Sequence, residues 1–427
     1  MGRRNAAKGA VSVVPVGACT NREKSKPRLD SCAIDGIKSE PKNIKRQKKS
    51  RKREASKENI QYVPFKQSNL IHYLDSFTRG TRGSEKLRQS CVDIIAEEIS
   101  NWELCRLEKS LVQQARITCL CWHPQNPYIL AVGSKAGEIL VYNWTSPSTS
   151  LSTVPLGSGA SIAAMKFHWD STVRMYSANL LGTVMLHHLD QGQSDTFWST
   201  NSLEVWFTAL DICPRRSMVL AGDNAGKTYA FSADGQRLWS TPRRLHKGKV
   251  KHIEFSLRDP NLLVTASVDH TVKFWDVRKL SHVTDVLHTI HHHKGLNSAY
   301  FSPSDGRSVL VTDQHSELRI HRGPTWEDVT AIRHPHRQFQ HLTAIQASWY
   351  PLEDVIVVGR YPEEKFLKND VRGIDLYCGN TGNLLHKVKA SLSVMRIFSL
   401  NSFNCTGDRL ASCTGHRVVA FRPPKEG

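Results

Sequence analysis

The chain has 427 residues, of which 39% are hydrophobic and 23% are charged, and it carries a formal net charge of +19. A chain of this size and composition can bury a large core, and no apolar run approaches the roughly 20 residues of a membrane-spanning helix, so no membrane association is expected. The positive charge favours an anionic partner.

Positive charge is concentrated in residues 1–60, which contain 17 Lys and Arg against 6 Asp and Glu. Such a surplus of like charges opposes folding, so we expect a disordered basic tail. The dense run of cations at residues 45–53 is typical either of a nuclear localisation signal or of a merely solvated tail, and its density favours the first. The predicted localisation residues are Lys45, Arg46, Lys48, Lys49, Arg51, Lys52 and Arg53. We therefore expect a nuclear protein.

The next segment, residues 67–114, has apolar residues at helical spacing and predicts an α-helical region. They are Leu70, Ile71, Leu74 and Phe77, then Leu87, Cys91, Ile94, Ile95 and Ile99, then Leu104, Leu107 and Leu111. Such amphipathic helices could lie on the strand-rich region that follows, or could offer their apolar faces to a groove of a partner. The second hypothesis is favoured because a closed ring of sheets needs no lid.

The ten cysteines include no Cys-X-X-Cys pair and no framework spacing, so reduced intracellular thiols are expected. Cys119 and Cys121 face one side of a predicted strand, as two metal ligands would, but no further pair stands at ligand spacing. Core packing is therefore the favoured interpretation for both. We expect no metal and no other cofactor.

Residues 115–423 repeat one unit: an alternating strand, a polar turn, an apolar strand of small residues, a short tip and a third alternating strand. The seven units begin near Ile117, Ile162, Phe207, Val250, Asn297, Ile345 and Ile397. This period is typical of a four-stranded propeller blade, and seven blades close a ring without free sheet edges. We predict an all-β, seven-bladed β-propeller preceded by the basic tail and the α-helical segment.

One face of this propeller is expected to carry both the loops between blades and the loops between the second and third strands of each blade. Cationic and aromatic residues gather in these loops, as phosphate contacts and base stacking require. The predicted contact residues are Arg116, Lys135, Trp206, Lys247, Lys249, Arg360 and Tyr361. A solvated side chain is the ordinary explanation for any single cation, but so many on one face favour an anion-binding surface.

Residues 334–341 are predicted to form a polar loop between two strands. The isolated Phe339 has polar neighbours and cannot bury itself in a blade core, while His336 and Arg337 invite an anionic partner. This pattern is typical of a wedge held out for insertion into a nucleic-acid stack. We expect His336 and Arg337 to contact DNA, and the wedge to consist of Phe339, Gln340 and His341.

Residues 267–276 match the tip and third strand of a WD repeat, which ends in Trp275-Asp276. From the helical segment to near its C-terminus the chain resembles the family of small WD-repeat subunits of UV-damaged-DNA-binding complexes. The stretches that carry the resemblance are 131–135 (AVGSK), 266–269 (ASVD), 275–278 (WDVR), 334–342 (HPHRQFQHL) and 357–362 (VVGRYP).

The resemblance implies recognition of photodimer-containing duplex DNA, with Phe339, Gln340 and His341 entering the minor groove while the damaged bases are flipped out. It further implies that nucleotide excision repair is initiated in chromatin by a substrate receptor of a cullin-RING ubiquitin ligase. The implied docking residues for the large multi-propeller adaptor of that ligase are Leu104, Leu107, Leu111, Trp275, Asp276 and Arg278. For Trp275 and Asp276, packing within the blade is the ordinary alternative.

Two other classes of function remain open. A WD-repeat substrate receptor or chromatin scaffold would bind protein or histone tails on the same face without damage specificity, and the basic loops argue against it. An enzyme is not expected, because the chain contains no Gly-rich phosphate loop, no GxSxG motif and no HExxH motif.

Overall fold

The computed structural model of the protein describes residues 85–105, 115–153, 156–157, 159–200, 202–280, 283–337, 343–361, 372–388 and 397–424. These residues lie within one compact unit, Phe65–Gly427. None of the helices found there is long and apolar enough to cross a membrane. The predicted basic tail and its localisation run lie outside the described residues.

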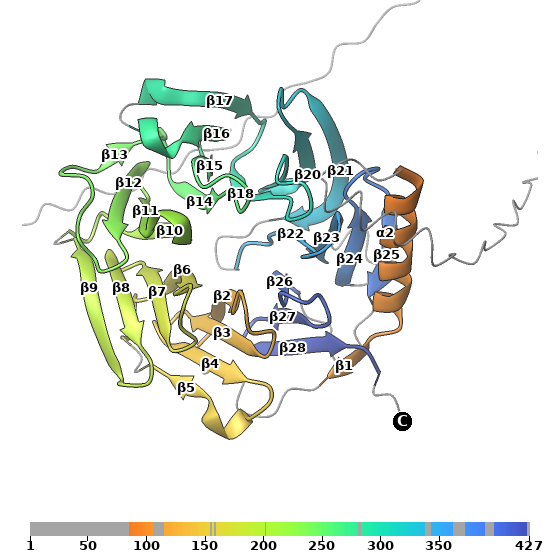
Figure 1. Ribbon diagram of the computed structural model, residues 1–427, viewed down its shortest axis with the longest axis horizontal. Coiled ribbons are helices and arrows are strands. Elements are labelled where there is room, and N and C mark those ends of the chain that lie inside the picture. Colours follow the sequence, from red (N-terminus) through yellow and green to blue (C-terminus); the bar gives the residue numbers. More distant parts are fainter. Residues whose placement is uncertain are drawn as a thin grey trace, which may run out of the picture. The chain divides into compact units, whose positions relative to one another are not determined.

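The described strands form seven four-stranded antiparallel sheets arranged as the blades of a ring (Figure 1). Blade one contains β2 (Ile117–Trp122), β3 (Ile129–Ser134), β4 (Ile139–Asn143) and β5 (Leu151–Ser152). Blade two contains β6 (Ile162–Phe167), β7 (Arg174–Asn179), β8 (Thr183–His188) and β9 (Gln193–Ser199). Blade three contains β10 (Phe207–Cys213), β11 (Met218–Asp223), β12 (Lys227–Ser232) and β13 (Arg243–Arg244). Blade four contains β14 (Val250–Phe255), β15 (Leu262–Ser267), β16 (Thr271–Asp276) and β17 (Val286–His291).

The remaining blades follow the same order. Blade five contains β18 (Leu296–Phe301), β19 (Ser308–Asp313), β20 (His315–Arg322) and β21 (Asp328–Arg337). Blade six contains β22 (Ser348–Trp349), β23 (Val355–Arg360), β24 (Gly373–Cys378) and β25 (Leu384–Val388). Blade seven contains β26 (Leu400–Phe403), β27 (Leu410–Thr414), β28 (Arg417–Arg422) and, from earlier in the chain, β1 (Glu103–Cys105). The short 3-10 helices of the described part are η2 (Pro147–Thr149), η3 (Pro214–Arg216), η4 (Val277–Lys279) and η5 (Val283–Asp285).

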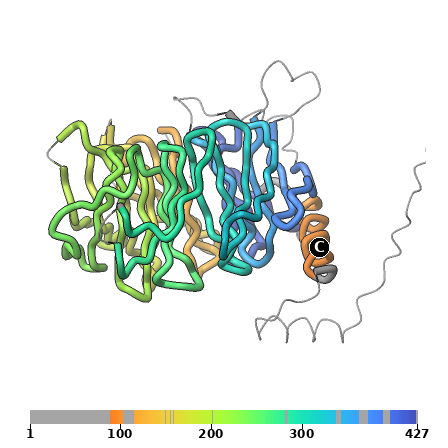
Figure 2. The backbone as a smooth tube through the Cα atoms, turned by 90° about the horizontal axis from the view of Figure 1, so that it is seen from above, coloured from red at the N-terminus to blue at the C-terminus, as the bar shows by residue number. Residues whose placement is uncertain are grey.

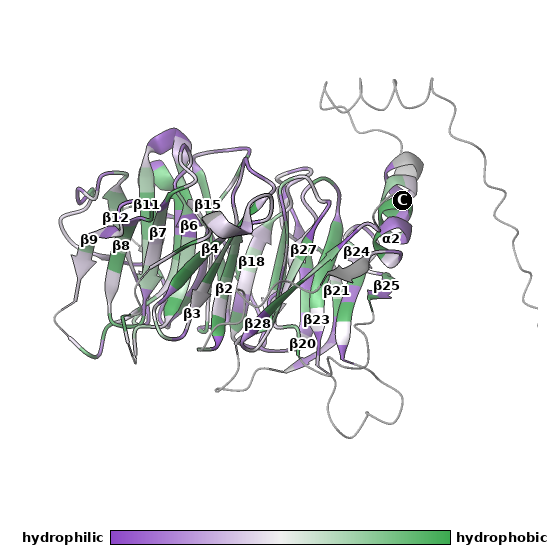
Figure 3. Ribbon diagram, turned by 90° about the horizontal axis from the view of Figure 1, so that it is seen from below, coloured by the Kyte–Doolittle hydropathy of each residue, from purple (hydrophilic) through white to green (hydrophobic). Residues whose placement is uncertain are grey.

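The predicted seven-bladed propeller is confirmed. The strands cross the thickness of the ring, so the loops emerge on two opposite faces (Figure 2). The second strands β3, β19 and β27 are buried at every position and the other second strands at all but an end residue, because neighbouring blades cover both of their sides. Apolar colour accordingly follows the strands and polar colour follows the loops (Figure 3).

The ring closes through β1, which pairs antiparallel with β28 and supplies the outer strand of blade seven. Leu104 lies opposite Phe421 in this pairing. The prediction of a helix at Leu104 is therefore wrong, and the propeller begins before the predicted boundary at residue 115. The error has a physical cause, since the pairing joins residues some three hundred positions apart and leaves no mark on the local apolar spacing.

The helix α2 (Glu85–Ser100) lies along the outer strand of blade six, as Figure 1 shows. Its buried side chains Val92, Ala96 and Ile99 face the propeller, and Val92 and Ile99 join the apolar core of blades six and seven. For this helix, packing on its own propeller is what the structure shows, although Ile94 remains half exposed. The predicted helical positions Leu107 and Leu111 lie outside the described residues.

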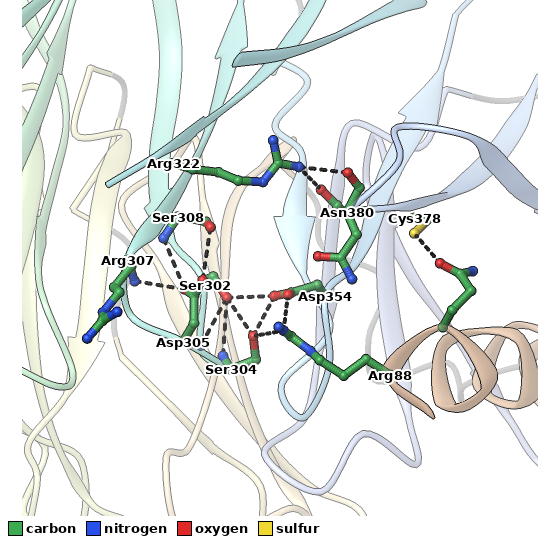
Figure 4. A network of polar contacts seen from close by, with 12 residues as sticks. Arg88, Ser302, Ser304, Asp305, Arg307, Ser308, Arg322, Asp354, Cys378 and Asn380 are labelled. Atoms are coloured by element: carbon green, nitrogen blue, oxygen red, sulfur yellow. Dashed lines mark hydrogen bonds and ion pairs between the residues drawn. The ribbon is translucent and has the colours of Figure 1, made fainter. Parts of the chain in front are cut away.

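A polar network fixes the start of α2 (Figure 4). Arg88 Nη2 donates to Asp354 Oδ2 at 2.6 Å, and the other carboxylate oxygen of Asp354 accepts from Ser302 Oγ at 2.7 Å and Ser304 Oγ at 2.5 Å. One buried carboxylate thereby joins the helix, blade five and blade six.

Candidate nucleic-acid interface

Four of the predicted contact residues come together at one mouth of the central channel. Arg116 and Lys249 precede the first strands of blades one and four, Trp206 precedes that of blade three, and Lys135 follows the second strand of blade one. All four line one open cavity of about 440 Å³, which we call the basic mouth. The convergence follows from strand order, because every first strand starts and every second strand ends on this face. One cavity is therefore lined by one indole and three cations.

Trp206 is held firmly at this mouth. Its backbone N–H donates to Asn224 Oδ1 at 3.0 Å, and its carbonyl accepts from the Asn224 N–H at 3.0 Å. The Lys249 ammonium lies 5.7 Å from the centre of the indole ring, within the range of a cation–π contact. The mouth therefore presents an aromatic ring, on a backbone held by Asn224, beside a positive charge.

A buried hydrogen-bond chain in blade four positions Lys247 and the residues around it. Asp269 Oδ2 accepts from the backbone N–H of Lys247 at 2.9 Å and lies 3.0 Å from Nδ1 of His246. His246 Nε2 lies 2.7 Å from Thr265 Oγ1, which also accepts from Trp275 Nε1 at 2.8 Å. These contacts leave the Lys247 side chain exposed.

Residues 334–341 were predicted to form a loop. The first four of them, residues 334–337, instead belong to the strand β21. His336 is 1% exposed, and its Nε2 lies 3.0 Å from the Asp313 carbonyl, so its predicted role in contacting DNA is wrong. Its Nδ1 lies 2.9 Å from Nδ1 of His334. Alternate positions of a strand point to the same side, and here positions 334 and 336 point inward. The side chain of Arg337 and the residues Phe339, Gln340 and His341 lie outside the described part.

Blade six supports the end of β21 from the other side. The backbone N–H of Tyr361 donates to the Pro335 carbonyl at 2.8 Å. Arg360 Nη1 donates to Asp375 Oδ2 at 2.8 Å, and only 11% of the Arg360 side chain is exposed. The structure thus corrects the predicted role of Arg360: its guanidinium is held inside the protein by Asp375 and is not turned toward a phosphate. Tyr361 is partly exposed and lies 5.2 Å from the Arg372 guanidinium.

Burial influences the protonation states of His334 and Asp375 at the end of β21. The pKa of His334 is lowered to about 4, because burial disfavours the charged imidazole more than nearby Asp375 favours it. Burial opposes ionisation of Asp375, but the interaction with His334, together with the charge and hydrogen bond of Arg360, outweighs it and lowers the pKa of the carboxyl. At neutral pH we therefore expect a neutral His334 beside an ionised Asp375.

The Trp-Asp-Val-Arg segment emerges on the opposite face, at the end of a third strand. Trp275 is fully buried, and Asp276 is largely buried and accepts from the Arg278 backbone N–H at 2.9 Å and from its Nη2 at 2.7 Å. For Trp275 the structure therefore shows the alternative of packing within the propeller, and Asp276 orients its neighbour Arg278. The side chain of Arg278 is 60% exposed and remains available.

Inside the channel the charges are mostly paired. Lys166 Nζ lies 2.8 Å from Asp211 Oδ1, and the second oxygen of Asp211 accepts from the backbone N–H of Phe255 at 2.7 Å. Burial raises the pKa of Glu254 to about 8, although the Phe301 N–H donates to it at 2.5 Å. These groups tie neighbouring blades together.

Cys119 and Cys121, for which core packing was favoured over metal binding, line the same channel. Burial raises the pKa of Cys119 to about 12, so its thiol stays protonated, as a packing residue requires. Within the described ranges no group of three or more His, Cys, Asp or Glu is arranged to hold a metal ion.

Two residues that shape this interface, Lys251 and Asp375, were not predicted from the sequence. Lys251 lines the basic mouth just inside Lys249, but its position depends on a β-bulge between paired strands that no local pattern reveals. Asp375 anchors Arg360 and lies near His334, but only the pairing of blades five and six brings them together.

Comparison with known proteins agrees with this architecture. One family model, described as "WD domain, G-beta repeat", matches residues 106–143 and 241–276. The DNA damage-binding protein 2 of Bos taurus is 36% identical over 369 residues, which cover 86% of this chain and 85% of the relative. That of Danio rerio is 35% identical over 356 residues, covering 83% of this chain and 71% of the relative. A plant relative, the Protein DAMAGED DNA-BINDING 2 of Arabidopsis thaliana, is 30% identical over 331 residues, covering 72% of this chain and 58% of the relative. The chain therefore belongs to the DNA damage-binding protein 2 family.

Proposed function

We propose that this protein recognises UV-damaged, photodimer-containing duplex DNA on the face that bears the basic mouth. The observation that carries the proposal is the cavity that Arg116, Lys135 and Lys249 line together with Trp206. Cations bind backbone phosphates without regard to sequence, and an aromatic ring offers a stacking surface to any base. The names of the relatives support the same ligand class.

The wedge of Phe339, Gln340 and His341 would then act at the lesion. A damaged pair stacks and pairs poorly, so flipping it out costs less than the few kcal/mol that an intact pair demands. An apolar side chain inserted from the minor groove fills the vacated space and stabilises a kinked duplex. The buried base of β21, held by the contacts of His336 with blade five and of Pro335 with blade six, supports this role, because a wedge needs a rigid mount.

The opposite face would serve assembly. Arg278 is exposed there with its guanidinium oriented by Asp276, an arrangement suited to a carboxylate or carbonyl on a partner. We propose that this face docks a large multi-propeller adaptor of a cullin-RING ubiquitin ligase, so that the protein acts as a non-catalytic substrate receptor that initiates nucleotide excision repair in nuclear chromatin. DNA and adaptor could then be bound together.

The decisive experiment compares wild type with Lys249→Glu on a photodimer-containing duplex and on the same duplex without damage, at two salt concentrations. Wild type should prefer the damaged duplex. Lys249→Glu should weaken both complexes together and make their salt dependence shallower, because it removes a phosphate contact. Lys279→Glu, an equal charge change at η4 on the opposite face, should leave both affinities nearly unchanged.

Equal wild-type affinity for the two duplexes would overturn damage recognition. Tight binding of a histone-tail peptide together with that result would favour the scaffold function instead.

A further inference from the structure

Five first strands of the propeller share one irregularity near the basic mouth. In blades one to five the pairing of the first with the second strand shifts by one residue just after the first strand begins. Such a β-bulge leaves one residue unpaired and redirects its side chain. The bulged residues are Thr118, Ala163, Thr208, Lys251 and Asn297.

Three of these positions connect neighbouring blades. Thr118 Oγ1 donates to the Ile162 carbonyl at 2.6 Å, and Asn297 Nδ2 donates to the Ile345 carbonyl at 3.1 Å. Thr208 Oγ1 donates in the same way to the Val250 carbonyl. A short donor side chain at the bulge therefore joins one blade to the first strand of the next, or to the segment that leads into it.

Lys251 departs from this pattern. Its ammonium has no hydrogen-bond or ion-pair partner among the described residues. The acids of the channel are already engaged, Asp211 by Lys166 and Glu254 by the backbone N–H of Phe301. Burial, and then the charge of Lys249, lower the pKa of Lys251 to about 8, so most of the side chain is still charged at neutral pH. The blade thus keeps a partly buried cation at a position that elsewhere holds a small neutral residue.

The position of Lys251 suits a ligand that enters from the mouth. It lines both the basic mouth and the 350 Å³ cavity of the channel beneath. Lys249 lies two residues before it, about 7 Å along an extended strand, and a lysine side chain spans most of that distance. A tetrahedral anion could contact both ammonium groups, and its negative charge would cancel their repulsion.

We propose that Lys251 and Lys249 together hold one phosphate group of bound nucleic acid at the inner rim of the basic mouth. The proposal rests on the proposed function in that the phosphate belongs to a bound duplex. It makes Lys251 an additional contact of the interface, deeper than the cations that sequence analysis identified. A free polyphosphate would offer the same chemistry, so the test separates the two sources.

The first test measures binding of an undamaged duplex by the full-length protein over a range of salt concentrations. Lys251→Met removes the charge and keeps the length. Because Lys249 still contacts the shared phosphate, the slope of log K against log salt should become shallower by at most about 0.9, and binding should weaken by up to about tenfold at 0.1 M salt. Lys251→Arg should keep the wild-type slope. The matched control Lys279→Met, on the opposite face, should not change it.

Lys251→Thr guards against a folding artefact, because blades one and three carry threonine at the same bulge. It should retain the wild-type melting temperature and lose the same increment of salt dependence as Lys251→Met. A wild-type slope in both neutral variants would overturn the proposal.

The second test follows the pKa of Lys251 by NMR of ¹³C-methylated lysines. Saturating duplex should raise that pKa above its value in the free protein, because the phosphate stabilises the ammonium. A rise with inorganic tripolyphosphate but none with duplex would overturn the assignment to a nucleic-acid phosphate. Because neither test uses a lesion, loss of damage preference in the protein would refute the proposed function and leave this inference standing.

Discussion

Arg88 Nη2 lies 2.6 Å from Asp354 Oδ2, an ion pair that joins the start of α2 to blade six. The Asp354 side chain is 5% exposed and also accepts from two serines of blade five. Removing the cation would leave a nearly buried carboxylate without its charged partner. The pair thus holds the helix on the propeller independently of the apolar contacts of Val92 and Ile99.

We expect Arg88→Ala to lower the free energy of unfolding by about 1 to 3 kcal/mol, as measured by urea denaturation. Asp93→Ala breaks the exposed hydrogen bond from Gln89 in the same helix and should cost less than about 0.5 kcal/mol. Equal losses in the two variants would contradict a special role for the Asp354 network.

Buried histidines should make the fold sensitive to acid. Burial lowers the pKa of His187, and of His334, to about 4, whereas an unfolded chain takes up these protons near pH 6.5. Between these values the unfolded state binds more protons, so stability is full above pH 6.5 and falls as the pH drops toward 4. Each residue contributes a loss of at most about 3 kcal/mol.

The measurement is the free energy of unfolding between pH 7.5 and 4.5. His187→Gln should flatten the profile in this window, because an amide offers hydrogen bonds to Ser177 and Ser194 and does not titrate there. His416→Gln, at an exposed histidine, should leave the profile unchanged. A profile that is the same for His187→Gln and wild type would show that His187 does not drive the acid sensitivity.

The wedge and the phosphate contacts should separate experimentally. Replacing Phe339, Gln340 and His341 with alanine removes the groups that would fill the vacated stack, while Arg116 and Lys249 remain. Preference for damaged duplex should fall by about 1 to 3 kcal/mol in competitive binding. Affinity for undamaged duplex and its salt slope should change little, and equal losses on the two duplexes would refute the wedge.

Arg278 should affect assembly and leave DNA binding intact, because it emerges on the face opposite the basic mouth. Arg278→His should weaken binding of the adaptor by at least about tenfold, since the shorter imidazole cannot reproduce the oriented fork of an arginine. Pull-down or calorimetry with the purified adaptor checks this. Loss of duplex binding in a protein that still melts as wild type does would contradict the assignment of faces.

Local pattern was enough to predict the seven blades and the basic face. Alternation along a strand depends on neighbours in sequence, so the first strands beginning at Ile117 and Val250 were located to the residue. Arg116 and Lys249 could be assigned to one face for the same reason, since strand direction alone fixes the side on which a loop emerges. The wedge of Phe339 lies outside the described residues and stays a prediction.

Long-range pairing decided the rest. Leu104 is a strand residue because β28 lies beside it, and His336 is buried because the pairing of β21 with β20 brings its ring against the Asp313 carbonyl of β19. Trp275 is buried because Thr265 and the core between blades three and four enclose it. The position of the Lys251 side chain is set by a β-bulge, which exists only because β14 pairs with β15. None of these facts has a local signature, because each is set by the residue that the fold brings opposite.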